Sequence, residues 1–180
     1  RRHWLDWAMF HVEPAYLDTW RAYYKALRQR NALLKQATQK RDLYRAWEEA
    51  MVESAYRLTG PRERFLQALA AESSGDAGGL FPPDVQVKLY PGWNEARRLD
   101  EVLNDHREAD RQGGYTRYGP HHADIRFTLG GKGLTSQFSR GQVKMYVTFL
   151  ILAEARVLAR QTAVTPLVLM DDFQAELDKD

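Results

Sequence analysis

Two short polar groups near the end of the sequence have residue types and a spacing that suit phosphate chemistry. The stretch Ser139 to Gln142 (SRGQ) precedes a long apolar segment, and Asp171-Asp172 follows the apolar run Leu167 to Met170 about 30 residues later. The start of a helix can bind an anion, and paired buried carboxylates are costly unless a metal ion or a proton neutralises them. Each group depends on the helix or strand beside it for its position.

The SRGQ stretch predicts a capped helix N-terminus. Ser139 is the expected N-cap, accepting from the third helical N–H, while Gln142 reaches back to the cap in a capping box. Arg140 begins a helix predicted to run to about Arg160, and Gly141 lets a phosphate approach the backbone closely. The helix is apolar almost all round, so we expect protein to enclose it. Many helices begin with such a cap and bind no ligand, so the cap alone does not establish a site.

The apolar run before the paired aspartates predicts a strand that is buried on both faces of a parallel sheet. Asp171 and Asp172 then lie at the carboxyl end of that strand, where open α/β sheets place their ligands. A strand that simply ends in a polar turn is the alternative for an isolated pair. The position of this pair after the SRGQ helix favours a ligand site.

Composition limits the class of protein. A hydrophobic fraction of 44% with five Trp, nine Tyr and seven Phe in 180 residues indicates a globular chain rather than a disordered one. The chain has no cysteine, which excludes disulfides and thiolate metal sites. No apolar run approaches the roughly 20 residues that a membrane-spanning helix requires, so we expect a soluble protein.

The net charge of +2 conceals a strong asymmetry along the chain. Residues 1–41 carry +6, residues 42–112 carry −5 and residues 113–180 carry +1. The first segment is therefore the expected nucleic-acid face.

A helix of about 22 residues from Pro14 has one apolar stripe, and basic residues lie on its flank. The stripe comprises Leu17, Trp20, Tyr24, Leu27, Asn31 and Leu34, and the basic residues are Arg21, Lys25, Arg28 and Lys35. They can follow a phosphate backbone, or form an ordinary solvated face.

The remaining elements are mostly helical. We expect a helix over residues 39–58 that pairs with the preceding one as an antiparallel hairpin, an interruption at Thr59 to Pro61, and a further helix from Pro61. The pattern then predicts a turn over residues 73–79, a half-buried strand over residues 84–90 and a charged helix over residues 94–112. Residues 115–127 read as two short strands around the turn Gly119-Pro120.

The histidines do not indicate a metal site. His106 is expected at the boundary between the apolar and charged faces of its helix. His121 and His122 with Asp124 could suggest zinc, but adjacent residues of a strand point to opposite faces, and one carboxylate does not complete a site.

The polar groups and several longer stretches resemble a known family. The SRGQ helix, the strand ending in two aspartates and the stretch Ala175 to Asp178 (AELD) resemble, in order, the signature loop, Walker B strand and D-loop of ATP-binding-cassette (ABC) ATPases. FHVEPAYLDTW, LRQRNALLKQ, YGPHHADIRF and DDFQAELD are similar to the RecF family, bacterial gap-repair proteins of the SMC-like class. The likeness covers nearly the whole chain, although residues 42–82 share only helical character.

The resemblance implies a mixed α/β, predominantly α-helical fold. Residues 1–112 would form a helical arm (lid) domain with a short strand near 84–90. Residues 113–180 would form part of an ABC/SMC-like ATPase head, with the GPHH loop (Gly119 to His122), the signature helix 139–160, the Walker B strand 166–171 and the D-loop 175–178. His121 would belong to a family loop of unknown role. The family most often has a basic residue after it, whereas this chain has His122, which carries no fixed charge.

The resemblance to this family also implies a mechanism. Two heads dimerise around two ATP molecules, and the signature residues of one head contact the γ-phosphate held by the other. Asp171 would hold Mg²⁺, largely through water, and Asp172 would orient the attacking water where the wider class has a glutamate. The signature residues are Ser139, Arg140, Gly141 and Gln142, and the D-loop residues are Glu176 and Asp178.

The family role is to bind double-stranded DNA at gaps or single/double-strand junctions with RecR and, with RecO, to help load RecA in recombinational repair and the SOS response. We expect a cytoplasmic, nucleoid-associated homodimer. No GxxxxGK[ST] sequence occurs, so we interpret the chain as an internal fragment that is inactive alone, from a parent with weak DNA-stimulated ATPase activity. The alternatives are another SMC-type ATPase head and a non-enzymatic helical module that binds DNA or a protein partner.

Overall fold

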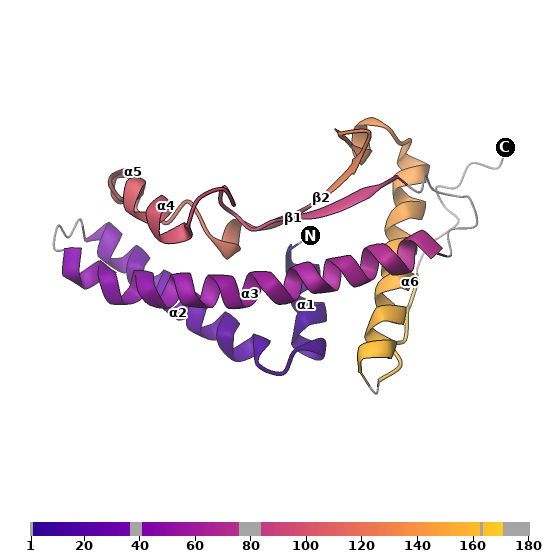
Figure 1. The fold of residues 1–180 in the computed structure, drawn as a ribbon, viewed down its shortest axis with the longest axis horizontal. Coiled ribbons are helices and arrows are strands. Elements are labelled where there is room, and N and C mark those ends of the chain that lie inside the picture. Colours follow the sequence, from indigo (N-terminus) through magenta and orange to yellow (C-terminus); the bar gives the residue numbers. More distant parts are fainter. Residues whose placement is uncertain (1, 37–40, 76–83, 163, 171–180) are drawn as a thin grey trace. The chain divides into compact units, whose positions relative to one another are not determined.

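The computed structural model describes residues 2–36, 41–75, 84–162 and 164–170, and they are mostly helical (Figure 1). The chain divides into two compact units that interleave in sequence: Arg1–Arg62 with Leu89–Asp124, and Glu63–Lys88 with Ile125–Asp180.

The elements are α1 (Arg2–Val12), α2 (Tyr16–Lys35), α3 (Arg41–Gly75), β1 (Gln86–Tyr90), α4 (Leu99–Asp105), α5 (Arg107–Gly113), the 3₁₀ turn η1 (Pro120–His122), β2 (Asp124–Leu129), β3 (Lys132–Gly133), the 3₁₀ turn η2 (Leu134–Ser136) and α6 (Arg140–Gln161).

The first unit contains the predicted antiparallel pair of long helices. α2 and the first part of α3 lie side by side (Figure 1), and the Arg30 guanidinium on α2 donates to Glu48 on α3 over 3.0 Å. The buried face of α2 is rotated from the predicted stripe. Leu27 and Leu34 are buried as predicted, but Tyr23 and Arg30 are buried in place of neighbouring residues on the predicted stripe.

The predicted break at Pro61 is wrong, because α3 continues through this residue. A proline inside a helix loses one backbone hydrogen bond and crowds the preceding turn, at a cost of about 3 kcal/mol. Apolar side chains are fully buried both before Pro61, at Ala55 and Leu58, and after it, at Phe65 and Leu69. Their burial on both sides outweighs the local cost.

The charged helix predicted over residues 94–112 is shorter and divided in two. The Asn94 side chain accepts from the backbone N–H of Ala96 over 3.0 Å, which favours a turn over a helix there. α4 then begins at Leu99, and His106 separates it from α5. Residues 115–118 do not form the expected strand, because their polar groups bond to helix side chains such as Asn31 rather than to another strand.

Most residues of the sheet belong to the second unit, and its strands lie in the order β1-β2-β3. The predicted strand at residues 84–90 is present as β1. β2 and β3 are antiparallel, with Thr128 opposite Gly133 and Leu129 opposite Lys132. The tight turn between them requires positive φ at both Gly130 (55°) and Gly131 (79°), which glycine adopts without strain.

Helix α6 begins at Arg140 and ends near the predicted boundary, at Gln161. The described residues cover only one of its faces, through side chains such as Tyr146, Leu150 and Val157. Val147 and Ile151 are 48% and 39% exposed, so the described residues alone do not enclose the helix as its apolar composition predicted. Among the described residues, no helix has the length and apolar character that crossing a membrane requires.

Candidate functional site

The N-terminus of α6 has the predicted capping box. The Ser139 Oγ accepts from the Gln142 backbone N–H over 3.2 Å, and the Gln142 Oε1 accepts from the Ser139 backbone N–H over 2.8 Å. Ser139, Arg140 and Gln142 are exposed, and Gly141 is half-buried. The first N–H groups of a helix have no acceptor within it, so those of Arg140 and Gly141 are available to an anion.

A short ordered segment holds the cap in place. The backbone N–H groups of Gln137 and Phe138 both donate to the Leu134 carbonyl over 2.9 Å, and Leu134 is buried. The Phe138 ring packs edge-on against Tyr146 of α6, with centroids 6.1 Å apart, and Phe127 of β2 packs on the same tyrosine at 6.0 Å. Burial raises the pKa of Tyr146 to about 12. The aromatic cluster therefore fixes the approach of the chain to Ser139.

The carboxylate half of the predicted site lies outside the described residues. This applies to Asp171, Asp172, Glu176 and Asp178. Residues 164–170 are described but have no regular secondary structure, and Leu167 and Leu169 are more than four-fifths exposed. A strand needs a neighbour for its hydrogen bonds, and no described residue pairs with this run. The Walker B strand and its metal site stay predictions.

The four basic residues proposed to follow DNA all lie on the exposed face of α2: Arg21, Lys25, Arg28 and Lys35. Arg21 also pairs with Asp18 over 3.3 Å, but both side chains are well exposed, so this ion pair contributes little stability. At about 1.5 Å of rise per residue, the stripe from Arg21 to Lys35 is about 21 Å long.

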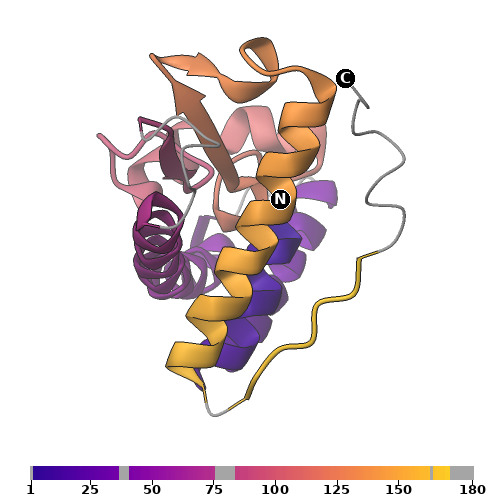
Figure 2. The same ribbon diagram turned by 90° about the vertical axis from the view of Figure 1, so that its right-hand side faces the viewer.

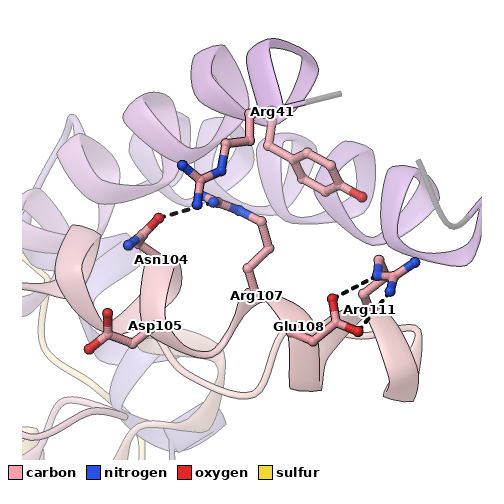
Figure 3. Close-up of a pocket in the computed structure, with 7 residues that line it drawn as sticks. Arg41, Asn104, Asp105, Arg107, Glu108 and Arg111 are labelled. Atoms are coloured by element: carbon pink, nitrogen blue, oxygen red, sulfur yellow. Dashed lines mark hydrogen bonds and ion pairs between the residues drawn. The ribbon is translucent and has the colours of Figure 1, made fainter. Parts of the chain in front are cut away.

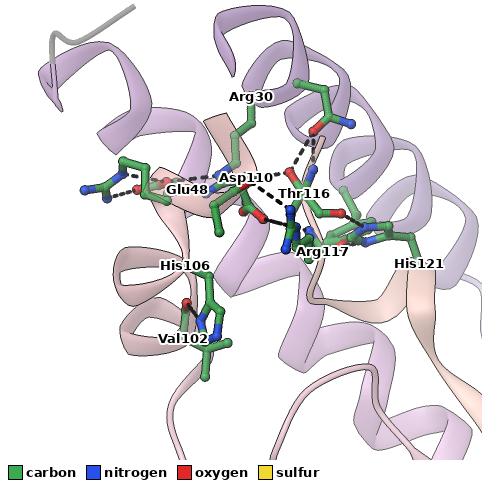
Figure 4. A network of polar contacts seen from close by, with 12 residues as sticks. Arg30, Glu48, Val102, His106, Asp110, Thr116, Arg117 and His121 are labelled. Carbon is green, nitrogen blue, oxygen red and sulfur yellow. Dashed lines mark hydrogen bonds and ion pairs between the residues drawn. The ribbon is translucent and has the colours of Figure 1, made fainter. Parts of the chain in front are cut away.

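The opposite face of α2 carries a buried network that the sequence did not reveal (Figure 4). Arg30 is fully buried and donates to Asp110 over 2.8 Å and to the Thr116 hydroxyl over 2.7 Å, in addition to its bond with Glu48. The Thr116 hydroxyl and backbone N–H both donate to the Asn31 side chain. Through these hydrogen bonds, Arg30 of α2 connects this helix to α3, to α5 and to the segment after α5.

His121 extends this contact into the GPHH loop. Its Nε2–H donates to the Thr116 carbonyl over 3.0 Å, so its Nδ1 accepts from the Tyr23 hydroxyl over 2.6 Å. Burial lowers the pKa of His121 to about 4, which keeps the ring neutral, and the bond to the Thr116 carbonyl fixes the tautomer. Burial likewise raises the pKa of Tyr23, so its hydroxyl remains a donor. His122, in contrast, is exposed.

A second buried arginine holds the other end of the loop. Arg62 on α3 contacts Asp6 through Nη2 at 2.6 Å and donates from Nη1 to the Pro120 carbonyl over 3.4 Å. The Tyr16 hydroxyl completes the cluster by donating to Asp6 over 2.6 Å. Two buried arginine networks therefore support the GPHH loop.

Sequence reasoning missed both arginines because charged residues are usually exposed. One signal was present: Tyr16, Tyr23 and Arg30 recur at steps of seven residues, which places them on one face of a helix. Their partners Asp6 and Asp110 are distant in sequence, and periodicity within one helix cannot identify them.

The arrangement is that of a helical arm joined to part of an ABC-type ATPase head. The capped N-terminus of α6 is the described feature that corresponds to the predicted signature helix. No family model matches the chain. Individual proteins do: the DNA replication and repair protein RecF of Chromohalobacter salexigens is 36% identical over 179 residues, and that of Stenotrophomonas maltophilia is 40% identical over 182 residues. Each alignment covers 99% of this chain and 50% of the relative.

Solved structures give the same result. A structure of the recombination mediator protein RecF with ATP, described for the RecFOR pathway, superposes with a TM-score of 0.84 at 24% identity, covering 99% of this chain and 51% of that one. A second RecF structure, with an ATP analogue, gives a TM-score of 0.83 at 25% identity. The chain is RecF-like along its length, and it spans about half the length of the curated relatives it matches.

Proposed function

We propose that this chain supplies the arm and the signature helix of a RecF-like, ATP-dependent DNA-binding protein of recombinational repair. The observation that carries the proposal is the capping box at Ser139 and Gln142, in a chain whose sequence and fold both match RecF. It leaves the first backbone N–H groups of α6 available to an anion, which supports its proposed role as a signature helix.

ATP binds between two copies of the protein. The copy that supplies this terminus contacts the γ-phosphate held by the other copy, through the N–H groups near Gly141 and the side chains of Ser139, Arg140 and Gln142. A helix terminus contributes only about 0.3 to 2 kcal/mol to anion binding, whereas micromolar affinity requires about 8 kcal/mol. The terminus alone is therefore too weak to bind ATP, and it acts as a sensor of nucleotide already bound to the partner.

The residues after α6 supply the hydrolytic half of the site. Asp171 would hold Mg²⁺, which would neutralise charge on the phosphates, and Asp172 would orient the attacking water. Because Asp172 is one methylene shorter than the glutamate of the wider class, hydrolysis is slow. Glu176 and Asp178 would belong to the D-loop of this site.

The exposed basic stripe of α2 binds the backbone of double-stranded DNA at gaps and junctions. Its length of about 21 Å matches roughly six phosphates of one strand, at 3.4 Å per base pair. In the cell, the dimer acts with RecR and RecO to help load RecA. The cytoplasm and the nucleoid are the corresponding location.

Sedimentation velocity tests the proposal on the full-length protein, meaning the chain extended to the length of its RecF relatives. We expect a monomer without nucleotide, a dimer with ATP, and tighter binding of a gapped duplex by the dimer. The 180-residue chain alone should bind MgATP with a dissociation constant weaker than about 10 μM. Tight ATP binding by the isolated chain contradicts the proposal. So does a full-length protein whose oligomeric state and DNA binding do not change with ATP.

A further inference from the structure

A pocket of about 290 Å³ in the first unit combines three arginines (Figure 3). Arg41 comes from the start of α3, and Arg107 and Arg111 come from α5; Asn104 of α4 also lines the space. We call this the arginine pocket. A guanidinium presents several N–H donors in a planar fork that matches the oxygens of a phosphate group.

Two of the three arginines are held in position by carboxylates. Arg107 donates to Glu48 over 2.7 Å and to the Asn104 side chain over 3.0 Å. Arg111 makes two hydrogen bonds with Glu108, at 2.7 and 2.9 Å. Because these side chains are already ordered, an anion that binds to them loses less conformational entropy to side-chain immobilisation.

Arg41 is the uncompensated charge of the pocket. Its guanidinium makes no hydrogen bond or ion pair with any residue in the described part of the chain, and it points toward Arg107 (Figure 3). The nearby Asp105 carboxylate binds Arg97 over 2.5 Å instead. Arg41 and Arg107 both line the pocket, and an anion bound there reduces the repulsion between their positive charges.

The arginine pocket continues the basic stripe of α2. Lys35 ends that stripe, and its Cγ lies 3.5 Å from the position that a Cβ would take on Gly114. Gly114 follows α5 directly, and Arg111 is in the last turn of α5. A phosphate backbone that follows the stripe past Lys35 therefore reaches the helix that carries Arg107 and Arg111.

We propose that the arginine pocket binds one backbone phosphate of the DNA that α2 contacts, with Arg41 as its principal ligand. This rests on the proposed DNA-binding function and adds a second contact to it. An acidic segment of a protein partner has similar charge, but the continuity with the α2 stripe favours the nucleic acid.

Fluorescence anisotropy with a gapped duplex over a range of KCl concentrations tests the proposal in the full-length protein. Arg41→Gln removes the free charge, and Asn104→Asp keeps an acceptor for Arg107 while adding a negative charge to the pocket. We expect either variant to weaken binding and Arg41→Gln to reduce the slope of log K against log salt by about 0.9, the value for one phosphate contact. Arg57→Gln is the matched control, since Arg57 is an exposed arginine on α3 outside the pocket, and should leave the slope unchanged.

The outcomes separate this proposal from the one it rests on. If the wild-type protein does not bind DNA, the proposed function fails, and this inference fails with it. If the wild type binds and charge reversal on α2 weakens binding, but Arg41→Gln and Asn104→Asp keep the wild-type slope, only the arginine pocket is overturned. If an acidic protein partner occupies the arginine pocket instead of DNA, the experiment gives this second result.

Discussion

The Tyr23 hydroxyl on α2 donates a 2.6 Å hydrogen bond to the Nδ1 of His121 in the GPHH loop, across 98 residues of sequence. The exposed face of the same helix carries the basic residues proposed to contact DNA. α2 therefore contacts the loop that leads into β2 through one face and presents its charges through the other. The histidine, whose role the sequence did not indicate, is a half-buried and neutral support of this loop.

Acid should destabilise the chain through His121. Its pKa is about 4 in the folded state and about 6.5 when unfolded, so the unfolded state binds the proton more readily. The resulting stabilisation is complete above about pH 6.5 and is lost as the pH falls towards 4. By linkage it amounts to about 3 kcal/mol. Urea unfolding at pH 7 and pH 4.5 measures it.

The control for this prediction is the neighbouring histidine. His121→Gln keeps a neutral polar side chain, so its stability should depend less on pH over this range, although it is lower at pH 7. His122→Gln, at the exposed position, should change this dependence far less than His121→Gln, because burial is the main cause of the lowered pKa of His121. Equal pH dependence in His121→Gln and the wild type would show that His121 is not the group that titrates.

The sequence predicted features that depend on neighbouring residues. The capping box involves residues three apart, and its geometry follows from the types of Ser139 and Gln142 alone. The pairing of α2 with α3 follows from two amphipathic segments with a short connection. These features need no knowledge of distant parts of the chain.

Features that depend on distant partners were not predictable in the same way. Arg30 and Arg62 are buried because Asp110 and Asp6 neutralise them, from 80 and 56 residues away. The continuity of α3 through Pro61 depends on packing at both of its ends. The apolar run at residues 164–170 shows the converse, since its pattern predicts a strand but no described residue provides a neighbour.

Charge reversal on α2 tests the DNA contact. Replacing Arg21, Lys25 and Arg28 by Glu in the full-length protein should weaken duplex binding and reduce the salt slope by about 2 to 3, because each phosphate contact releases counterions. Anisotropy titrations at several salt concentrations measure both effects. These side chains are exposed, so folding should be preserved.

The matched control reverses three exposed arginines elsewhere, Arg57, Arg64 and Arg126. It changes the net charge by the same amount, so it separates a local contact from a general electrostatic effect. Equal losses in both triple variants would mean that net charge alone governs binding, and an unchanged slope in the α2 variant would leave its basic residues as a solvated face.

Ser139→Arg should separate nucleotide binding from dimerisation. The substitution removes a cap that contributes about 1 kcal/mol, and it places a bulky side chain where the partner's γ-phosphate must approach. We expect the full-length variant to bind ATP with nearly wild-type affinity and to remain a monomer in sedimentation velocity with ATP. Thr135→Arg, at an exposed position in η2, is the control and should still dimerise. A Ser139→Arg variant that dimerises with ATP would remove the signature role from this residue.

Asp172→Asn should have the opposite effect to Ser139→Arg, because it should preserve the ATP-dependent dimer and slow ATP hydrolysis. The amide has nearly the size of the carboxylate, but it cannot accept a proton from the attacking water or orient it by charge. ATP should therefore bind and the dimer should form, while hydrolysis falls by about a hundredfold, within the usual range for loss of a general base. Because hydrolysis would end the dimeric state in the proposed mechanism, the dimer of this variant should outlive that of the wild type when free ATP is removed. Phosphate release and sedimentation velocity on the same samples measure the two effects.

Asp84→Asn, which changes an exposed aspartate, should alter neither. Wild-type hydrolysis by Asp172→Asn would assign the activation of water to another residue.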